Sequence, residues 1–433
     1  MSFVCDCLSV NALGHLTIGG ADVPALAEKY GTPLFLMDED AVRATCRELN
    51  TALHRHYSGP FLVAYASKAL SCKYVYQVMN EENMGADVAS GGELYTALAA
   101  GFPADKIIFH GNNKTRQELF LGLKSGVGRF VVDNREELHM LNNLAAELGV
   151  KPCISLRITP GVEAHTHEFI QTGKIDSKFG FTLENGQAEA IIGEAIELPH
   201  INVAGLHCHI GSQIFEADPF AHTAKLMMDF ISRVKARWGY TLTELNLGGG
   251  FGIKYIESHK PRSTDEVVEL TAKTVAEQAE KLGLPLPRLV LEPGRFIVGP
   301  NGITVYTVGA VKDIPNVRTY VSVDGGMTDN PRFALYGAAY EAILPERPEA
   351  ARDHLVTVAG RCCESGDLLG KDIQLPEVKS GDLLAVLATG AYNYSMASNY
   401  NRVPRPPVVM VSGGADRLVI RREGYEDLIS LDM

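Results

Sequence analysis

Residues 61–70 read FLVAYASKAL, a mostly apolar run that ends at Ser67 and Lys68. Such a run followed by a polar pair is typical of a buried β-strand and the loop after it. A lysine at the carboxyl end of a buried strand is costly unless it is paired or used chemically, because burial disfavours the ammonium ion. Taken alone, Lys68 is better explained as a side chain that extends into solvent.

The same pattern continues on both sides of this stretch, from about residue 33 to about residue 300. A short apolar run, a turn and a helix-like amphipathic segment recur along the chain. Seven or eight such units in series predict a parallel sheet and, at this length, a (β/α)8 barrel over residues 36–300. An open doubly wound sheet has the same local pattern and remains an alternative. The other apolar runs are Ile107–Phe109, Phe130–Val132, Ile154–Ile158, Val203–His209, Leu245–Leu247 and Leu289–Leu291.

The pattern changes after residue 300. Short apolar stretches separated by Gly, Pro and Asp turns predict a mainly antiparallel β domain over residues 301–433. We expect residues 1–35, which include the strand-like segment Leu8–Ile18, to join this domain. The stretches are Thr304–Val311, Thr319–Val323, Leu355–Val358, Leu383–Leu387, Val408–Val411 and Arg417–Arg421.

Charge and composition exclude several classes of function. The 433 residues include 40 Lys and Arg against 52 Asp and Glu, a net charge of -12, which argues against binding to nucleic acid or to an anionic membrane. No apolar stretch is long enough to span a membrane, and Met1–Leu16 does not resemble a signal peptide. The eight cysteines are scattered without paired CxxC motifs, so we expect a cytoplasmic protein with reduced thiols and no metal site.

Two histidines stand two residues apart in HCHIGSQ, residues 207–213. On a strand they would face the same side, but no third ligand stands at a spacing that supports a metal site. His209 could instead present its flat ring to a cofactor, with Ser212 near a phosphate. A buried, hydrogen-bonded histidine is the default interpretation of both His207 and His209.

Two further motifs follow predicted strands. Residues 246–252 read NLGGGFG, and consecutive glycines at Gly248–Gly250 cost backbone entropy, so they favour a phosphate-binding loop over a simple bend. Their spacing matches neither a Walker loop nor GxGxxG. Residues 292–295 read EPGR, where a buried Glu292 needs a cationic partner, either Arg295 or a protonated pyridine nitrogen.

A cysteine beside an acidic residue occurs late in the β region, where residues 362–367 read CCESGD. Cys363 could be a surface thiol or a proton donor near a carbanion. Together, these motifs indicate a pyridoxal-phosphate site. Lys68 offers an amine, His209 a flat ring to stack on the cofactor, Gly248–Gly250 a phosphate-binding loop and Glu292 a carboxylate for the ring nitrogen.

The chain resembles the diaminopimelate decarboxylase branch of the fold-type III pyridoxal-phosphate decarboxylases, a family that includes ornithine and arginine decarboxylases and alanine racemase. The resemblance extends along the whole chain. It is carried by YASKA (65–69), GADVAS (85–90), HCHIGSQI (207–214), LNLGGGFG (245–252), EPGR (292–295), DGGMTDNPRFALYGA (324–338), CESGD (363–367) and GAYNYSMASNYN (390–401).

The resemblance implies a role for each site residue. Lys68 would be the Schiff-base lysine, His209 would stack on the ring and Glu292 would meet the pyridine nitrogen, with Cys363 as proton donor and Glu364 as acceptor for the distal ammonium. Cys363 and Glu364 would come from the partner subunit of a homodimer. The remaining cofactor contacts would be Asp87, Ser212, Gly248, Gly249, Gly250, Gly294, Arg295 and Tyr392, and the substrate contacts would be Arg295, Arg332, Tyr336, Glu364 and Tyr392.

The implied reaction is the decarboxylation of meso-2,6-diaminopimelate to L-lysine. Two departures stand out: Leu70 replaces a commoner Asn, and Cys362 adds a second thiol beside the expected donor. The alternatives are an ornithine, arginine or carboxynorspermidine decarboxylase, an amino-acid racemase, or a non-enzymatic relative. We also expect the segment Gly161–Gly180 to close over the substrate, because it follows an apolar strand and includes the glycines of TGKIDSKFG.

Overall fold

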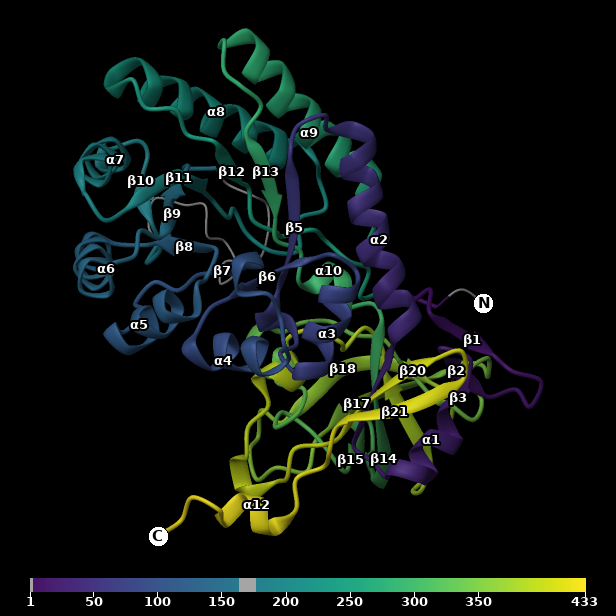
Figure 1. Cartoon of the computed structure of the whole chain (residues 1–433). Helices are drawn as coiled ribbons and strands as arrows, with labels where there is room; N and C mark the ends of the chain where they lie inside the picture. The colour runs from purple at the N-terminus through teal and green to yellow at the C-terminus, as the bar shows by residue number, and fades with distance from the viewer. Residues whose placement is uncertain (1–2, 163–176) are drawn as a thin grey trace. The chain divides into compact units, whose positions relative to one another are not determined.

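The computed structural model describes residues 3–162 and 177–433 (Figure 1). Most of the segment that we expect to close over the substrate, residues 163–176, therefore lies outside the described residues. The chain forms two compact units. One contains residues 45–252 and 261–296, and the other contains residues 1–44, 253–260 and 297–433.

The first unit is built on a closed ring of eight parallel strands, which confirms the predicted (β/α)8 barrel. Sequence neighbours pair in turn, and the ring closes where Leu289–Leu291 of the last strand pair with Phe61–Val63 of the first. A short strand, β10 (Phe181–Thr182), adds to β9 outside the ring. The ring strands are β5 (Phe61–Ala66), β6 (Gly85–Val88), β7 (Ile107–Phe109), β8 (Arg129–Val132), β9 (Cys153–Thr159), β11 (Asn202–His207), β12 (Glu244–Asn246) and β13 (Arg288–Leu291).

Helices alternate with these strands and surround them (Figure 1). Their ends follow local sequence signals: Thr115 and Ser263 open helices with capping boxes, and Gly126, Gly149 and Gly239 end helices in the left-handed conformation. The helices are α2 (Glu39–His56), α3 (Lys73–Glu81), α4 (Gly91–Ala99), α5 (Arg116–Ser125), α6 (Arg135–Leu148), α7 (Gln187–Glu197), α8 (Asp218–Trp238), α9 (Thr264–Lys281) and α10 (Arg295–Val298).

The interior of the barrel is packed with small and branched side chains. Ala64, Ile108, Val131 and Val290 form a buried cluster, with Leu62 packed against it. These residues come from β5, β7, β8 and β13, so the ring is a filled core and not a pore.

A buried carboxylate joins several strands at their amino ends. Glu244, the first residue of β12, accepts two hydrogen bonds from Arg129 of β8, at 2.8 and 2.9 Å. It also accepts one from Ser155 of β9 at 3.2 Å and lies 3.7 Å from Arg288 of β13. Because β8 and β12 are not neighbours in the sheet, this network ties strands together across the barrel.

The second unit is a mainly antiparallel β domain, as predicted. Its large sheet has the order β18-β17-β15-β14-β4-β20-β21, with β16 and β19 branching from it. Two pairs in this sheet, β15 with β17 and β4 with β20, are parallel. The strands are β4 (Leu34–Asp38), β14 (Gly302–Ile314), β15 (Arg318–Val323), β16 (Ala342–Ile343), β17 (His354–Ala359), β18 (Leu368–Leu375), β19 (Leu383–Val386), β20 (Val408–Ser412) and β21 (Ala415–Ile420).

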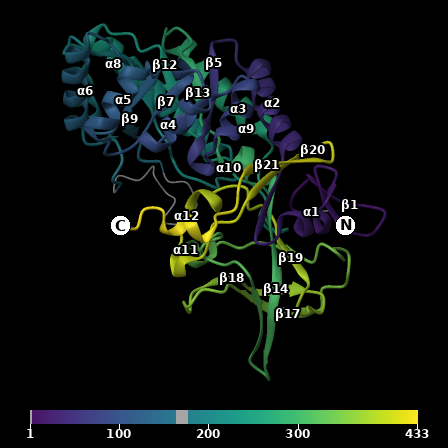
Figure 2. The ribbon, with the colours of Figure 1, turned by 60° about the horizontal axis from the view of Figure 1, so that its bottom comes forward.

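The long strand β14 organises this sheet (Figure 2). Its first half pairs with β4 and β19, and its second half pairs with β15. The N-terminal segment lies in the same unit but forms a sheet of its own from β1 (Leu8–Val10), β2 (Leu16–Ile18) and β3 (Ala21–Asp22). Three helices complete the unit: α1 (Val23–Tyr30), α11 (Arg332–Tyr336) and α12 (Tyr425–Ile429). Among the described residues, no helix has the length and apolar character needed to cross a bilayer.

We predict that Glu244→Ala lowers the free energy of unfolding by about 3–5 kcal/mol, because it leaves the nearly buried Arg129 guanidinium without its partner. Urea denaturation measures the change. Arg116→Ala is the matched control: it breaks an exposed pair with Glu147 and should cost at most about 1 kcal/mol. Equal losses in the two variants would contradict the prediction.

Candidate active site

Polar side chains of the barrel unit gather beyond the carboxyl ends of its strands. Lys68 lies in the short turn Ser67–Ala69 after β5, His110 directly follows β7, and Glu292 directly follows β13. The carboxyl ends of parallel strands meet at one end of a barrel, which is where barrel enzymes carry out their chemistry. This end is therefore the candidate active site.

The centre of this site is the carboxylate of Glu292, which is 6% exposed. Its Oε1 lies 2.7 Å from His110 Nε2 and accepts a 2.6 Å hydrogen bond from Asn246 Nδ2, and its Oε2 lies 3.1 Å from His207 Nε2. Burial raises the pKa of this carboxyl, but the two histidines outweigh it and hold the pKa well below its usual value. Glu292 is thus an ionised carboxylate held by three side chains.

The surrounding groups have shifted pKa values too. Burial lowers the pKa of His207 to about 3, so its ring is neutral. Its Nδ1 is buried and has no hydrogen-bond partner among the described residues. Asp87 of β6 lies 3.7 Å from His110, and burial raises its pKa to about 6 although His110 and Lys68 oppose the shift. Perturbed groups of this kind are typical of a functional site.

His110, His207 and Glu292 could also bind a metal ion, because their ligand atoms lie within 4.8 Å of one another. The short contacts from Glu292 to both rings already satisfy these atoms as hydrogen bonds. His209, the other candidate of the expected histidine pair, lies beyond the end of β11 and contacts a different group. The two histidines therefore do not act as a pair of ligands.

The loop Gly248–Gly250 is packed too tightly for side chains. A Cβ at Gly249 would lie 2.1 Å from the carbonyl oxygen of Glu292, and one at Gly250 would lie 2.4 Å from that of Gly211. The backbone N–H of Gly249 donates to His209 Nδ1 at 3.3 Å. Burial and the charge of Lys68 hold the pKa of His209 well below its usual value, so the ring can accept this bond.

Arg295, Ser212 and Gly294 lie together beside this loop. The guanidinium of Arg295, 6% exposed, donates to Ser212 Oγ at 3.3 and 3.0 Å. A Cβ at Gly294 would lie 2.8 Å from the carbonyl oxygen of Ala66, so this glycine allows the loop after β13 to contact the end of β5. Lys68, two residues after Ala66, is exposed although Ser67 and Ala69 on either side of it are buried, so its amine is accessible.

The remaining predicted residues lie in the β-domain unit. Arg332 is 7% exposed and donates to the hydroxyl of Tyr340 at 2.6 Å, and its guanidinium lies 5.0 Å from the ring centre of Tyr255. No carboxylate of the described residues lies within ion-pairing distance of Arg332. Tyr336 is partly buried, and Tyr392 is partly buried with a left-handed φ of 61°.

The two adjacent thiols differ in environment. Cys363 and Glu364 are exposed, whereas Cys362 is partly buried. Burial and the neighbouring Asp367 raise the pKa of Cys362 to about 11.

Sequence reasoning missed two partners of Glu292. His110 lies 182 positions from Glu292 in the chain and Asn246 lies 46 positions away. Both lie at the end of a predicted strand, and this position alone could have identified them as candidate site residues.

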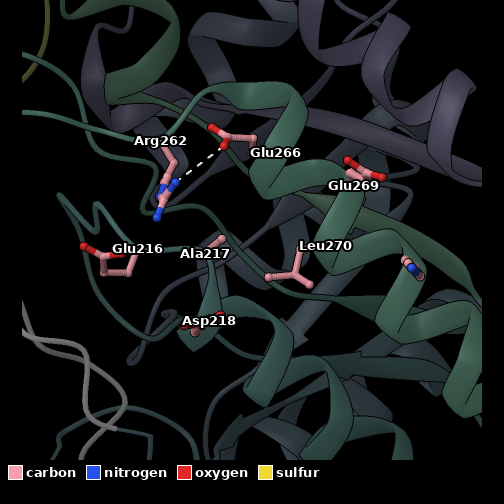
Figure 3. A pocket seen from close by; sticks show the side chains of 8 residues that line it. Glu216, Ala217, Asp218, Arg262, Glu266, Glu269 and Leu270 are labelled. Atoms are coloured by element: carbon pink, nitrogen blue, oxygen red, sulfur yellow. Dashed lines mark ion pairs between the residues drawn. The ribbon is translucent and has the colours of Figure 1, made fainter.

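A separate hollow of about 320 Å3 lies at the start of α8 and α9 (Figure 3). In it Arg262 faces Glu266 at 3.5 Å, and none of the predicted site residues lines it. Its lining residues are Glu216, Ala217, Asp218, Arg262, Glu266, Glu269, Leu270 and Lys273.

Comparison with known proteins gives matches over nearly the whole chain. Residues 39–299 match the family described as pyridoxal-dependent decarboxylase, pyridoxal binding domain. A diaminopimelate decarboxylase of Bacillus subtilis is 51% identical, covering 98% of this chain and 96% of that one. One from Synechocystis is 46% identical, covering 98% and 91%. The crystal structure of a diaminopimelate decarboxylase from M. jannaschii with L-lysine has a TM-score of 0.93 and 36% identity, covering 100% of this chain and 99% of that one.

We predict that the His207 ring of the folded protein takes up its proton with a midpoint near pH 3, against about 6.5 in the unfolded chain. Because the unfolded chain then binds a proton that the folded chain does not, stability should fall as the pH decreases from about 6.5 toward 3. NMR of 15N-labelled histidine measures the midpoint, with His207→Gln to assign the signal. A midpoint near 6.5 in the folded protein would refute this.

Proposed function

The chain belongs to the diaminopimelate decarboxylases, within the pyridoxal-dependent decarboxylase family, and from this premise we infer that it decarboxylates meso-2,6-diaminopimelate to L-lysine and carbon dioxide, the last step of lysine biosynthesis. The resemblance noted in the sequence motifs is thereby confirmed. The observation that carries the function is the presence of an ionised Glu292 and an exposed Lys68 at the same carboxyl end of the barrel.

The cofactor is pyridoxal phosphate, and the residues at the barrel end fit it. When bound, it supplies an electron-poor ring that accepts the electron pair left by the departing carboxylate. Lys68 offers an amine for its aldehyde, Glu292 an anion for its ring nitrogen, and His209 a flat neutral ring. Asp87 adds a second acid beside Lys68 and His110.

We assign the phosphate to the loop side of this site. A Cβ at Gly248, Gly249 or Gly250 would collide with neighbouring backbone. The absence of side chains here lets an anion come close to the backbone N–H groups, which supports the assignment. Ser212 and the backbone at Gly294 and Arg295 would complete the phosphate contacts, with Tyr392 as a further cofactor contact.

The substrate has two carboxylates, and we assign them to arginines. Arg332 is a nearly buried guanidinium with a tyrosine hydroxyl as partner and no carboxylate at ion-pairing distance in the described chain, an arrangement that suits an incoming carboxylate. Arg295, Tyr336 and Tyr392 would bind substrate as well, and Glu364 would accept the distal ammonium.

Cys363 is the proposed proton donor to Cα after carbon dioxide leaves. Its exposure favours Cys363 as the working thiol, because Cys362 is partly buried and burial raises the pKa of Cys362 to about 11. We propose that the protein is a cytoplasmic homodimer, in which the partner subunit's Cys363 and the partner subunit's Glu364 complete each active site. The exposed position of both side chains supports this proposal.

A panel of substrates tests the function. We expect kcat/KM to be highest on meso-diaminopimelate, with carbon dioxide and L-lysine as products, and a loss of at least about a thousandfold in Lys68→Ala. Higher activity on ornithine, arginine or carboxynorspermidine would show that this other compound, and not meso-diaminopimelate, is the substrate. Epimerisation without carbon dioxide release would indicate a racemase.

For Arg332→Lys, we expect KM for meso-diaminopimelate to rise about ten- to a hundredfold, because a bidentate guanidinium contact is lost. Steady-state kinetics measures this. Arg318→Lys, which changes an arginine paired with Asp372 on the β-domain sheet, is the control and should leave KM unchanged. An unchanged KM in Arg332→Lys would show that Arg332 does not bind the substrate.

A further inference from the structure

The loop Gly360–Asp367 joins β17 to β18 and carries the partly buried Cys362 and the exposed Cys363. Its base is closed by backbone bonds: Gly360 N–H donates to the carbonyl of Asp367 at 2.9 Å, and Asp367 N–H donates to that of Glu364 at 3.0 Å. Asp367 itself is only 3% exposed, so its carboxylate lies beneath the loop.

The Asp367 carboxylate holds two backbone groups at once. One oxygen accepts the N–H of Cys362 at 2.6 Å, and the other accepts the N–H of Met327 at 2.6 Å. Two glycines make room for it, because a Cβ at Gly326 or Gly360 would lie 2.5 or 2.2 Å from a carboxylate oxygen. Asp367 therefore joins the Cys362 peptide to a neighbouring turn.

A second side chain holds the next peptide. Asn401 Oδ1 accepts the N–H of Cys363 at 2.8 Å, and the hydroxyl of Tyr400 contacts the carbonyl oxygen of Cys363 at 3.4 Å. Asn401 and Arg402 both have left-handed backbones, with φ of 52° and 55°, which non-glycine residues disfavour. Arg402 is held there by Asp432 at 3.0 Å and by the carbonyl of Leu428.

Two consecutive N–H groups, those of Cys362 and Cys363, are thus each held by a separate side chain. The two peptides that flank the Cys363 Cα are held by Asn401 at the N–H and by the Tyr400 hydroxyl at the carbonyl, and Asp367 holds the peptide before them. Together these contacts restrict the direction of the Cα–Cβ bond of Cys363 and hence the region that its thiol can reach. The left-handed backbone at Asn401 and Arg402 places the Asn401 carboxamide at the loop, as backbone strain often does at a functional site.

We propose that Asn401 and Asp367 are positioning residues that hold the Cys363 thiol for proton transfer. The inference rests on the proposed role of Cys363. Because a misplaced donor slows the chemical step, loss of either contact should lower kcat by a larger factor than it raises KM, to which Glu364 of the same loop contributes.

Asn401 allows the hydrogen bond to be separated from the backbone strain. Asn401→Gly removes the acceptor while tolerating the left-handed backbone, and Asn401→Asp keeps an acceptor of the same length. In the full-length, cofactor-loaded enzyme, Asn401→Gly should lower kcat about ten- to a hundredfold with a smaller rise in KM, and Asn401→Asp should restore kcat to within about threefold. Asp367→Asn, which keeps only one acceptor oxygen, should behave like Asn401→Gly.

Hydrogen exchange followed by mass spectrometry gives a readout that does not depend on activity. Amides of the peptide containing Cys363 should exchange at least about tenfold faster in Asn401→Gly than in wild type or Asn401→Asp. Asn316→Gly is the matched control, because Asn316 is also an exposed asparagine with a left-handed φ of 59°, on the hairpin between β14 and β15. It should change neither exchange at the Cys363 loop nor kcat.

Unchanged exchange in Asn401→Gly would overturn the proposed contact, and faster exchange with wild-type kcat would overturn the positioning role. Failure of the proposed role of Cys363 is distinguishable, since it would appear as wild-type kcat in Cys363→Ala whatever the exchange result. Failure of the proposed function would appear as no release of carbon dioxide from meso-diaminopimelate by the wild-type enzyme.

Discussion

A carboxylate that stays ionised inside a barrel is the constraint on which the site depends. Glu292 is almost fully buried, and such a charge persists only where hydrogen bonds and opposite charge replace water. His110, His207 and Asn246 supply hydrogen-bond partners from the ends of three different strands. The site is built around this one group: the tight glycine loop packs against its backbone, and burial keeps the His207 ring beside it neutral.

Much of the fold could be predicted from local pattern. The run Phe61–Ala66 is a strand with those same bounds. Strand β6, however, was not among the apolar runs, because Gly85 and the buried acid Asp87 interrupt it. Strand β18 was missed for a similar reason, since Lys371 and Asp372 lie within it. Residues that serve a site or an exposed face break the periodicity on which such predictions rest.

The site itself was only partly predictable. Lys68, His209 and Glu292 could be proposed because each follows a strand and each has chemistry that a cofactor needs. His110 could not, because its role comes from contact with a residue 182 positions away. The hold of Asn401 on the Cys363 peptide is likewise a tertiary contact, between residues 38 positions apart, for which no spacing rule exists.

Glu292 and Glu244, two of the buried glutamates of the barrel unit, also limit how such a chain can be recombined. Glu292 depends on residues at β7, β11 and β12, while Glu244 depends on β8, β9 and β13. A cut between β8 and β9 would leave both carboxylates without a necessary partner. The barrel is therefore a single unit of recombination: exchanging half of it with a relative succeeds only where the glutamates and their distant partners travel together or already match.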